Sequence, residues 1–190
     1  MVEPGGNSLR AAAAAALAPG DRALVLGPGT IGLLTAMFAR ADGADLHLMG
    51  RSEESLAFAR TLGLDNVWTE DSLPDLPFDA VIDASNAAHL PALALDLVES
   101  AGRVVYIGLA GRPSLIDTRT LALKDVTAVG ILSASPALDD TIAAYASGAV
   151  DPRPLVAATV GLDQVSAVLA GRRPPGAGAG PKIHIDPRLS

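Results

Sequence analysis

The chain has 190 residues and a formal net charge of −7, and 49% of its residues are hydrophobic while 18% are charged. This composition is sufficient for a large buried core and excludes a disordered tail. No stripe of lysine and arginine occurs, so we expect no nucleic-acid partner. The chain contains no cysteine, which excludes a disulfide framework, a cysteine-ligated zinc site and a cysteine nucleophile.

The N-terminal segment does not have the pattern of a secretory signal. It lacks a basic region, and the alanine run Ala11–Ala16 is too short and too weakly apolar to act as a signal-peptide core. No run of about 20 apolar residues occurs, so we expect no membrane partner. These features predict a cytoplasmic protein.

Apolar runs alternate with helix-like segments along most of the chain. The predicted elements, in order, are a helix over 9–17 capped by Asn7 or Ser8, a buried strand over 22–27, a helix over 30–41, a strand over 45–50, a helix begun by Ser52, a short strand over 66–68, a strand over 78–84, a helix over 87–99, strands over 102–108 and 126–132, and a helix over 136–146. This alternation predicts an α/β fold with one doubly wound parallel sheet, the Rossmann architecture.

The character of the chain changes after about residue 151. Prolines interrupt it, residues 163–170 form one short helix candidate, residues 172–181 form an extended loop, and residues 182–186 alternate like a final strand. We therefore divide the chain into a leading helix and linker (1–20), a dinucleotide-binding domain (21–150), and a tail (151–190) that is too small to be a domain by itself.

A glycine motif follows the first predicted strand. Gly27, Gly29 and Gly32 match G-x-G-x-x-G between an apolar run and a predicted helix. In this context the first glycine permits a tight turn, the second lets a pyrophosphate approach the backbone, and the third lets helix and strand pack closely. The helix N-terminus adds free N–H groups and the positive end of the helix dipole. The motif predicts a dinucleotide-binding turn, with a glycine-rich turn that binds nothing as the alternative.

The end of the second predicted strand bears on the choice of cofactor. A methyltransferase or an NAD(H)-dependent enzyme needs an acidic residue there to bind ribose hydroxyls, but Gly50 occupies the position, followed by Arg51 and Ser52. Without the carboxylate a 2′-phosphate is not repelled, and an arginine can bind it. We therefore predict NADP(H) in preference to NAD(H). A solvated surface arginine is the alternative for Arg51.

Residues 20–33 resemble the coenzyme domain of medium-chain, zinc-type alcohol and polyol dehydrogenases. The similarity continues, in family order, through residues 78–85, 102–109, 123–130, 146–152 and 182–186. The resemblance implies an oxidoreductase that transfers hydride between a nicotinamide cofactor and an alcohol or carbonyl substrate. It also implies that the tail returns towards a catalytic domain.

The resemblance assigns cofactor contacts to four loops. The pyrophosphate would lie against Gly27, Gly29, Thr30, Ile31 and Gly32, and the adenosine ribose would face Gly50, Arg51 and Ser52. Ala84 and Ser85 would lie near the adenosine side, and Ile107, Gly108, Leu109 and Leu132 would line the nicotinamide side. Because the family's last strand often pairs with its own copy, residues 126–132 are implied as a homodimer edge, with an ordinary sheet edge as the alternative.

The family's catalytic domain precedes its coenzyme domain and holds zinc through a cysteine and a histidine–glutamate pair. This sequence has no such set: Glu3 and Pro4 resemble only the acidic region near zinc in polyol-type members, and one carboxylate cannot hold a catalytic zinc ion. We therefore expect this chain to bind no metal, with zinc present only in a full-length relative, and we assign no catalytic residue.

The sequence leaves two functions open. The first is the NADP(H)-binding part of a dehydrogenase, inactive when isolated because half of its cleft is absent. The second is a truncated, non-catalytic module that binds a dinucleotide or dimerises. A Ser/His/Asp hydrolase using Asp83, Ser85 and His89 is a minor alternative, since no G-x-S-x-G elbow occurs.

Overall fold

A six-stranded parallel sheet forms the centre of residues 1–150, with the strand order β3-β2-β1-β4-β5-β6. The structure is a computed structural model that describes residues 1–189. The chain divides into two units, residues 1–150 and residues 151 onward, each described by itself. The strands are β1 (Arg22–Leu26), β2 (Asp45–Met49), β3 (Val67–Trp68), β4 (Phe78–Asp83), β5 (Val98–Tyr106) and β6 (Thr127–Gly130).

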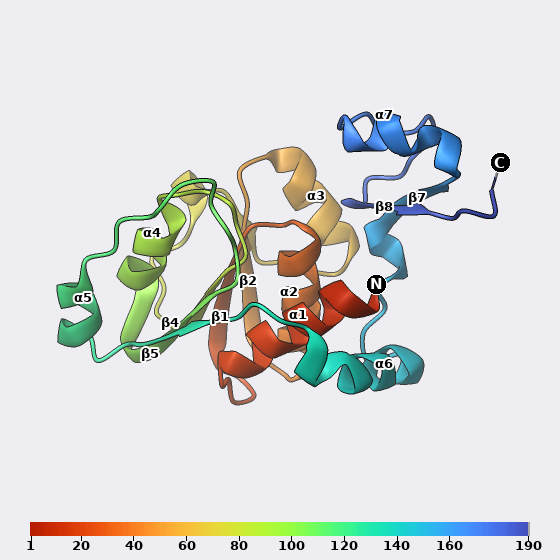
Figure 1. Cartoon of the computed structure of the whole chain (residues 1–190). Coiled ribbons are helices and arrows are strands. Elements are labelled where there is room, and N and C mark those ends of the chain that lie inside the picture. The colour runs from red at the N-terminus through yellow and green to blue at the C-terminus, as the bar shows by residue number, and fades with distance from the viewer. Residues whose placement is uncertain (190) are drawn as a thin grey trace. The chain divides into compact units, whose positions relative to one another are not determined.

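Helices cover both faces of this sheet. They are α1 (Val2–Ala14), α2 (Thr30–Ala41), α3 (Glu53–Thr61), α4 (Leu90–Leu97), α5 (Thr118–Leu123) and α6 (Leu138–Ser147), with short 3₁₀ turns η1 (Glu70–Ser72) and η2 (Ser135–Ala137). Figure 1 shows α1, α2 and α3 on one side of the sheet and α4 and α5 on the other. The doubly wound parallel sheet predicted from the sequence is therefore confirmed.

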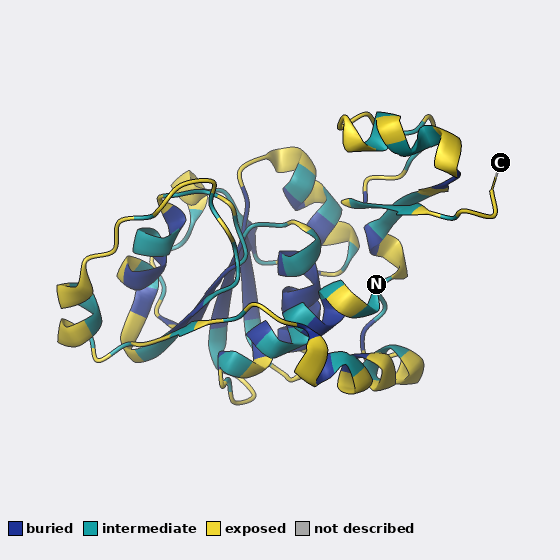
Figure 2. Ribbon diagram, in the orientation of Figure 1, coloured by how far each residue is buried: buried dark blue, intermediate teal, exposed yellow. Residues whose placement is uncertain are grey.

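The core lies on the central strands because these are apolar on both faces. Four of the five residues of β1 are buried, as are the last four residues of β4, and both strands are dark blue in Figure 2. Phe78, Leu24 and Leu95 are among the largest fully buried side chains, and they belong to a core that joins the sheet to α4. Burial of this surface stabilises the sheet whose carboxyl edge holds the site.

The predicted start of the first helix was wrong. The helix begins at Val2 rather than Leu9, and Ser8 does not cap it. The Ser8 hydroxyl lies 2.8 Å from the Pro4 carbonyl oxygen and 3.1 Å from that of Ile31, inside the contact between α1 and α2. Pro4 is tolerated because it lies in the first turn, where its missing N–H has no helical partner.

Close packing explains the two glycines in the same helix. A Cβ on Gly5 would lie 2.2 Å from the Tyr145 hydroxyl oxygen on α6, and a Cβ on Gly6 would lie 2.9 Å from Ala134. In the sequence alone these glycines interrupt a helical pattern. In the structure they allow α1 to approach its neighbours.

Other element boundaries differ from those predicted. The helix predicted over 87–99 is confined to Leu90–Leu97, because β5 already begins at Val98 and continues to Tyr106. The strand predicted over 126–132, which is the last strand of the six-stranded sheet, pairs with β5 only from Thr127 to Gly130. The sequence patterns did not predict α5, whose cap is the Asp117 carboxylate, 2.9 Å from the Arg119 amide nitrogen.

The second unit consists of a small two-stranded parallel sheet with short helical turns. Its elements are η3 (Arg153–Leu155), β7 (Val156–Val160), η4 (Leu162–Gln164), α7 (Val165–Leu169) and β8 (Lys182–Ile185). The sequence predicted β8, as a strand over residues 182–186, but it did not predict β7. Leu162 and Leu169 are 59% and 82% exposed, so this unit leaves apolar surface uncovered within itself.

Candidate functional site

A groove of ≈ 1070 Å³ lies at the carboxyl edge of the six-stranded sheet. The strands are parallel, so the loops that follow β1 to β5 all reach this edge, which is where ligands bind in doubly wound folds. Most of the predicted site residues line the groove, namely Gly27, Gly29, Ile31, Gly50, Arg51, Ser52, Ala84, Ser85, Ile107, Gly108 and Leu109. Folding therefore brings together residues that are more than 80 positions apart in the sequence.

Three predicted residues do not line this groove. Thr30 is the first residue of α2, beside Gly29, and Gly32 is buried beneath the groove. Leu132 follows β6 and is 79% exposed. Cofactor contacts stay predictions for these three residues, as they do for the residues that line the groove.

The three glycines of the motif differ in what the fold requires of them. Gly27 has φ +99°, a conformation that other residues rarely adopt, and its amide donates to the Met49 carbonyl oxygen at 2.8 Å. A Cβ on Gly32 would lie only 1.9 Å from the Gly27 carbonyl oxygen. Gly29 is exposed, has ordinary extended angles (φ −81°, ψ −176°), and has open space for at least 4 Å around the point where a Cβ would be. The fold therefore requires glycine at positions 27 and 32, whereas its backbone angles and packing would accept another residue at position 29.

The loop after β2 forms the next part of the groove. Gly50 is buried, and a Cβ there would lie 2.8 Å from Pro28 Cγ, so a carboxylate cannot occupy the position without displacing the glycine turn. Arg51 lines the groove, is exposed, and forms no ion pair with any residue from 1 to 189. Ser52 caps α3, because its hydroxyl accepts from the Ser55 amide at 3.3 Å.

Acidic residues after β3 were not predicted to belong to the site. Glu70 and Asp71 line the groove together with His89, which precedes α4. A 3.1 Å contact joins His89 Nε2 to Glu70 Oε2 across this part of the groove. No periodicity signal points to Glu70, because it begins the short 3₁₀ turn η1, which is only three residues long.

The hydrolase alternative finds no support in this geometry. His89 contacts Glu70, whereas the Asp83 carboxylate accepts from the backbone amide of Ser85 at 2.9 Å. No hydrogen bond joins the His89 ring to the Ser85 hydroxyl among the residues that the structure describes. The three residues therefore do not form a nucleophile–base–orienter arrangement.

Two titratable groups at the ends of β4 and β5 lie close to the groove without lining it. Asp83 is 2% exposed, and its burial raises the pKa of the carboxyl group, while hydrogen bonds from Ser85 and the charge of His89 act in the opposite direction. Burial also raises the pKa of Tyr106 to about 12, and the Asp83 charge adds to that effect. The Tyr106 hydroxyl donates to the Pro91 carbonyl at 2.9 Å, which ties β5 to the start of α4.

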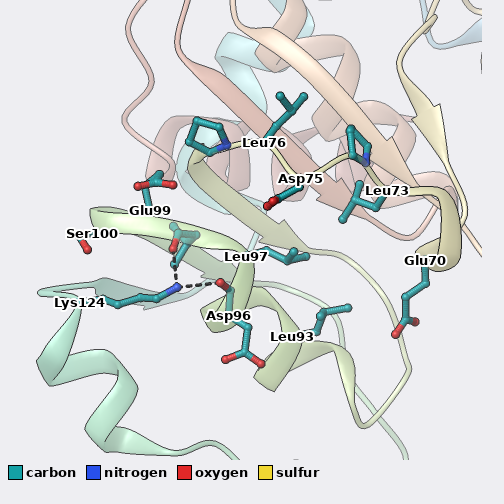
Figure 3. Close-up of a pocket in the computed structure, with 13 residues that line it drawn as sticks. Glu70, Leu73, Asp75, Leu76, Leu93, Asp96, Leu97, Glu99, Ser100 and Lys124 are labelled. Atoms are coloured by element: carbon teal, nitrogen blue, oxygen red, sulfur yellow. Dashed lines mark hydrogen bonds between the residues drawn. The ribbon is translucent and has the colours of Figure 1, made fainter.

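A second hollow, of ≈ 710 Å³, lies between the segment before β4 and the end of α4 (Figure 3). Lys124 is the principal cation there, and its Nζ lies 3.0, 2.7 and 2.9 Å from the carbonyl oxygens of Leu95, Asp96 and Val98. These are the free carbonyls at the end of α4, so Lys124 acts as a helix C-terminal cap. The hollow is thus a packing feature at the other end of α4 from the glycine motif.

The structure also bears on zinc and on membranes. Among residues 1–189, no group of three or more histidine, cysteine, aspartate or glutamate side chains is placed to hold a metal ion. The residues present therefore do not fit a zinc site of the kind that the family resemblance implies. No helix in the same part of the chain is long and apolar enough to cross a membrane.

Comparisons with known proteins agree with this fold. L-galactonate-5-dehydrogenase of Escherichia coli K12 is 32% identical over 152 residues, which cover 72% of this chain and 43% of that protein. A protein from Sinorhizobium meliloti 1021 described as a zinc-binding dehydrogenase, solved with NADP, superposes with a TM-score of 0.87 at 21% identity, covering 98% of this chain and 58% of the other. The 2R,3R-butanediol dehydrogenase of Bacillus subtilis gives a TM-score of 0.84 at 22% identity, covering 98% and 56%.

The family match itself covers most of the first unit, residues 1–150. Residues 30–147 match the family described as "Zinc-binding dehydrogenase". The chain spans about half the length of the curated relatives that it matches. The match confirms the resemblance predicted from the sequence, and the chain belongs to the zinc-binding dehydrogenase family.

Proposed function

We propose that this chain is the coenzyme-binding part of a zinc-type alcohol or polyol dehydrogenase and that its carboxyl-edge groove binds NADP(H). The intact enzyme would transfer hydride between the nicotinamide and an alcohol or carbonyl substrate. The family membership and the position of the groove support this proposal. The relatives include enzymes named L-galactonate-5-dehydrogenase, sorbitol dehydrogenase and D-xylulose reductase.

Gly29 is the observation that carries the proposal. Its backbone angles suit any residue, and no atom lies within 4 Å of the place where a Cβ would be. Neither strain nor packing therefore explains a glycine at this position. The close approach of a ligand to the backbone does explain it, and a pyrophosphate at the start of a 12-residue helix without a side-chain cap is such a ligand.

The chain's own residues would bind each part of the cofactor. Gly27, Gly29 and Ile31, with Thr30 and Gly32, would hold the pyrophosphate, while Ala84 and Ser85 would lie beside the adenosine. Ile107, Gly108 and Leu109, with Leu132, would form the nicotinamide side. The bound dinucleotide supplies the hydride acceptor or donor. The protein supplies position and exclusion of water.

The preference for NADP(H) over NAD(H) rests on Gly50, Arg51 and Ser52. Gly50 cannot be replaced by an acidic residue without a clash, and Arg51 is exposed in the groove without an ionic partner among residues 1–189. A 2′-phosphate would provide that partner. Similar solved structures include one with NADP, from Sinorhizobium meliloti 1021, and one with NADH, from Escherichia coli CFT073, so the preference rests on these three residues.

Fluorescence titration of the chain with NADPH and with NADH tests both parts of the proposal. We expect NADPH to bind more tightly, and we expect Arg51→Gln to reduce NADPH affinity about tenfold while leaving NADH affinity within about twofold. Arg112→Gln, at an exposed arginine that does not line the groove, is the matched control. Equal or tighter binding of NADH by the unmodified chain would overturn the assignment to NADP(H).

Catalysis belongs to the part of the enzyme that this chain does not contain. We propose that residues 151–190 complete a catalytic domain, with domain limits at residues 21 and 150, and that the isolated chain has no turnover. The exposed apolar residues of the second unit support this, because they suit a surface that another domain covers. Alcohol oxidation by the 190-residue chain with NADP⁺ and zinc would contradict this part of the proposal.

Dimerisation through residues 126–132 is proposed separately. β6 is an edge strand, and Thr127, Ala128 and Gly130 are exposed, so its outer backbone is available for pairing with a second copy. Analytical ultracentrifugation should show a dimer that Ala128→Lys converts to a monomer. If Ala128→Lys leaves the sedimentation unchanged, the edge is not the interface.

A cytoplasmic location of the intact protein also stays a prediction, which cell fractionation can check.

A further inference from the structure

A buried carboxylate lies beneath the groove without lining it. Asp83 is the last residue of β4 and is 2% exposed. In the sheet register it stands between Leu26 of β1 and Tyr106 of β5, so it occupies the centre of the carboxyl edge. A buried charge is costly unless it is hydrogen-bonded. Its partners therefore indicate what the carboxylate does.

The Asp83 side chain holds the turn that follows β4. Its Oδ1 accepts from the Ser85 amide at 2.9 Å, and the Ser85 hydroxyl in turn accepts from the Ala87 amide at 3.3 Å. The backbone carbonyl of Asp83 accepts from the amides of Ile107 at 3.0 Å and Gly108 at 2.8 Å. One residue therefore joins the loop after β4 to the loop after β5.

This turn is also the surface against which two glycines of the groove pack. A Cβ on Gly108 would lie 1.9 Å from the Ser85 carbonyl oxygen, and a Cβ on Gly27 would lie 3.2 Å from the Ala84 carbonyl oxygen and from Ser85 Cα. The turn thus touches the pyrophosphate side of the groove at Gly27 and the nicotinamide side at Gly108. Its conformation sets the distance between these two walls.

We propose that Asp83 is the positioning residue of the groove: its carboxylate fixes the turn over residues 84–87 and thereby sets the affinity for the dinucleotide. The inference deepens the proposed function and rests on it. Asp83 does not line the groove, so it acts through Ser85 and not through contact with the cofactor. The role depends on an oxygen acceptor at Oδ1, which asparagine also supplies.

Two kinds of substitution separate the acceptor from the rest of the side chain. Asp83→Asn keeps an oxygen acceptor and removes the charge, whereas Asp83→Leu keeps a similar volume and leaves the Ser85 amide without a partner. We expect the leucine variant to bind NADPH about tenfold more weakly and the asparagine variant to stay within about threefold of the unmodified chain. Asp83→Val is a second apolar variant should Asp83→Leu not fold.

Asp79 provides a matched control on the same strand. Its carboxylate also accepts from a backbone amide, that of Arg22 at 2.8 Å, but it lies at the amino end of β4, away from the groove. Asp79→Leu removes a hydrogen bond of the same kind, from a backbone amide to a carboxylate, at an exposed residue of the same strand. It should change NADPH affinity by less than about twofold, even where it lowers the thermal stability.

The titrations are paired with amide hydrogen exchange of the cofactor-free chain, measured by NMR at Ser85 and Ala87. Faster exchange in the apolar variants, slow exchange in Asp83→Asn, and rescued affinity in Asp83→Asn would support the inference. Unchanged affinity in the apolar variants, while the unmodified chain binds NADPH, would overturn it and leave the proposed function standing. An asparagine variant as weak as the leucine variant would also overturn it. If the unmodified chain binds neither NADPH nor NADH, the proposed function fails, and this inference fails with it.

Discussion

Gly32→Ala tests the structural account of the glycine motif most directly, because two physical effects oppose each other at this position. Gly32 lies in the first turn of α2, where alanine has the higher helix propensity by about 1 kcal/mol. The new Cβ, however, would lie 1.9 Å from the Gly27 carbonyl oxygen, whereas real Cβ atoms do not approach within 3.0 Å. Propensity alone predicts a more stable protein, and sterics predict a less stable one.

The contacts around Gly32 decide whether the alanine substitution stabilises or destabilises the protein. The obstructing atom belongs to the backbone of a turn with φ +99°, so it cannot rotate away as a side-chain end could. Relief requires α2 to move by more than 1 Å, and residues 32–39 of this helix are buried. Overpacking of this kind costs about 1–3 kcal/mol or more. We expect a net loss of about 2 kcal/mol in the free energy of unfolding.

Urea denaturation followed by circular dichroism measures this loss, with Gly29→Ser as the matched control. Serine is at least as good a helix N-cap as glycine, and the space around Gly29 is open, so Gly29→Ser should change the free energy of unfolding by less than about 0.5 kcal/mol. The same variant should bind NADPH at least about tenfold more weakly, because its side chain occupies the approach of the pyrophosphate. A Gly32→Ala protein as stable as the unmodified chain would refute the steric reasoning, and normal NADPH binding by Gly29→Ser would refute the account of Gly29.

Three further predictions concern stability. Burial lowers the pKa of His47 below its ordinary value of 6.5, so the unfolded chain takes up a proton more readily than the folded chain. The contribution of His47 to stability should be complete above pH 6.5 and should fall as the pH drops below it, and His47→Gln should weaken this pH dependence. Unfolding can be followed by the fluorescence of Trp68, whose indole N–H donates to His47 Nδ1 at 3.0 Å. Lys124→Met should lower the free energy of unfolding, measured by urea denaturation, by about 1–2 kcal/mol, because three carbonyl oxygens at the end of α4 lose their donor. An unchanged urea midpoint would show that water replaces the ammonium group. Gly5→Ala should lower the thermal midpoint despite better helix propensity, because its Cβ would lie 2.2 Å from the Tyr145 hydroxyl oxygen, and a raised midpoint would show that α6 can move aside.

Local patterns were sufficient to predict the sheet and the two groove segments after β1 and β2, while the family resemblance supplied the segments after β4 and β5. The apolar run over Arg22–Leu26, the glycine spacing after it and the helix-like segment over 30–41 each carry their own signal. In a parallel sheet the ends of such strands must share one edge. Gly27 was placed in the site by its motif, whereas Leu109, 82 positions later, was placed in the same site by the family resemblance, and both line the groove.

Boundaries and several groove residues could not be predicted in this way. Gly5 and Gly6 weaken a helix when considered locally, and only the position of Tyr145 and Ala134 against α1 shows why they are favourable. Glu70 follows β3 and His89 follows β4, and their contact depends on how the fold places these two segments, which no sequence period encodes. The second unit's β7 lacks alternation and was missed for that reason.

The sequence by itself determined most of the strand and helix order, the location of the glycine turn and the family, because these depend on residues close together in the chain. Only the tertiary structure decided which glycines serve the fold and which one is free to serve a ligand, since that depends on what a Cβ would meet. It also decided the role of Asp83, whose hydrogen bonds join the ends of β4 and β5. Hydrogen-bond partners across a sheet are set by register and burial, and neither can be read from a single strand.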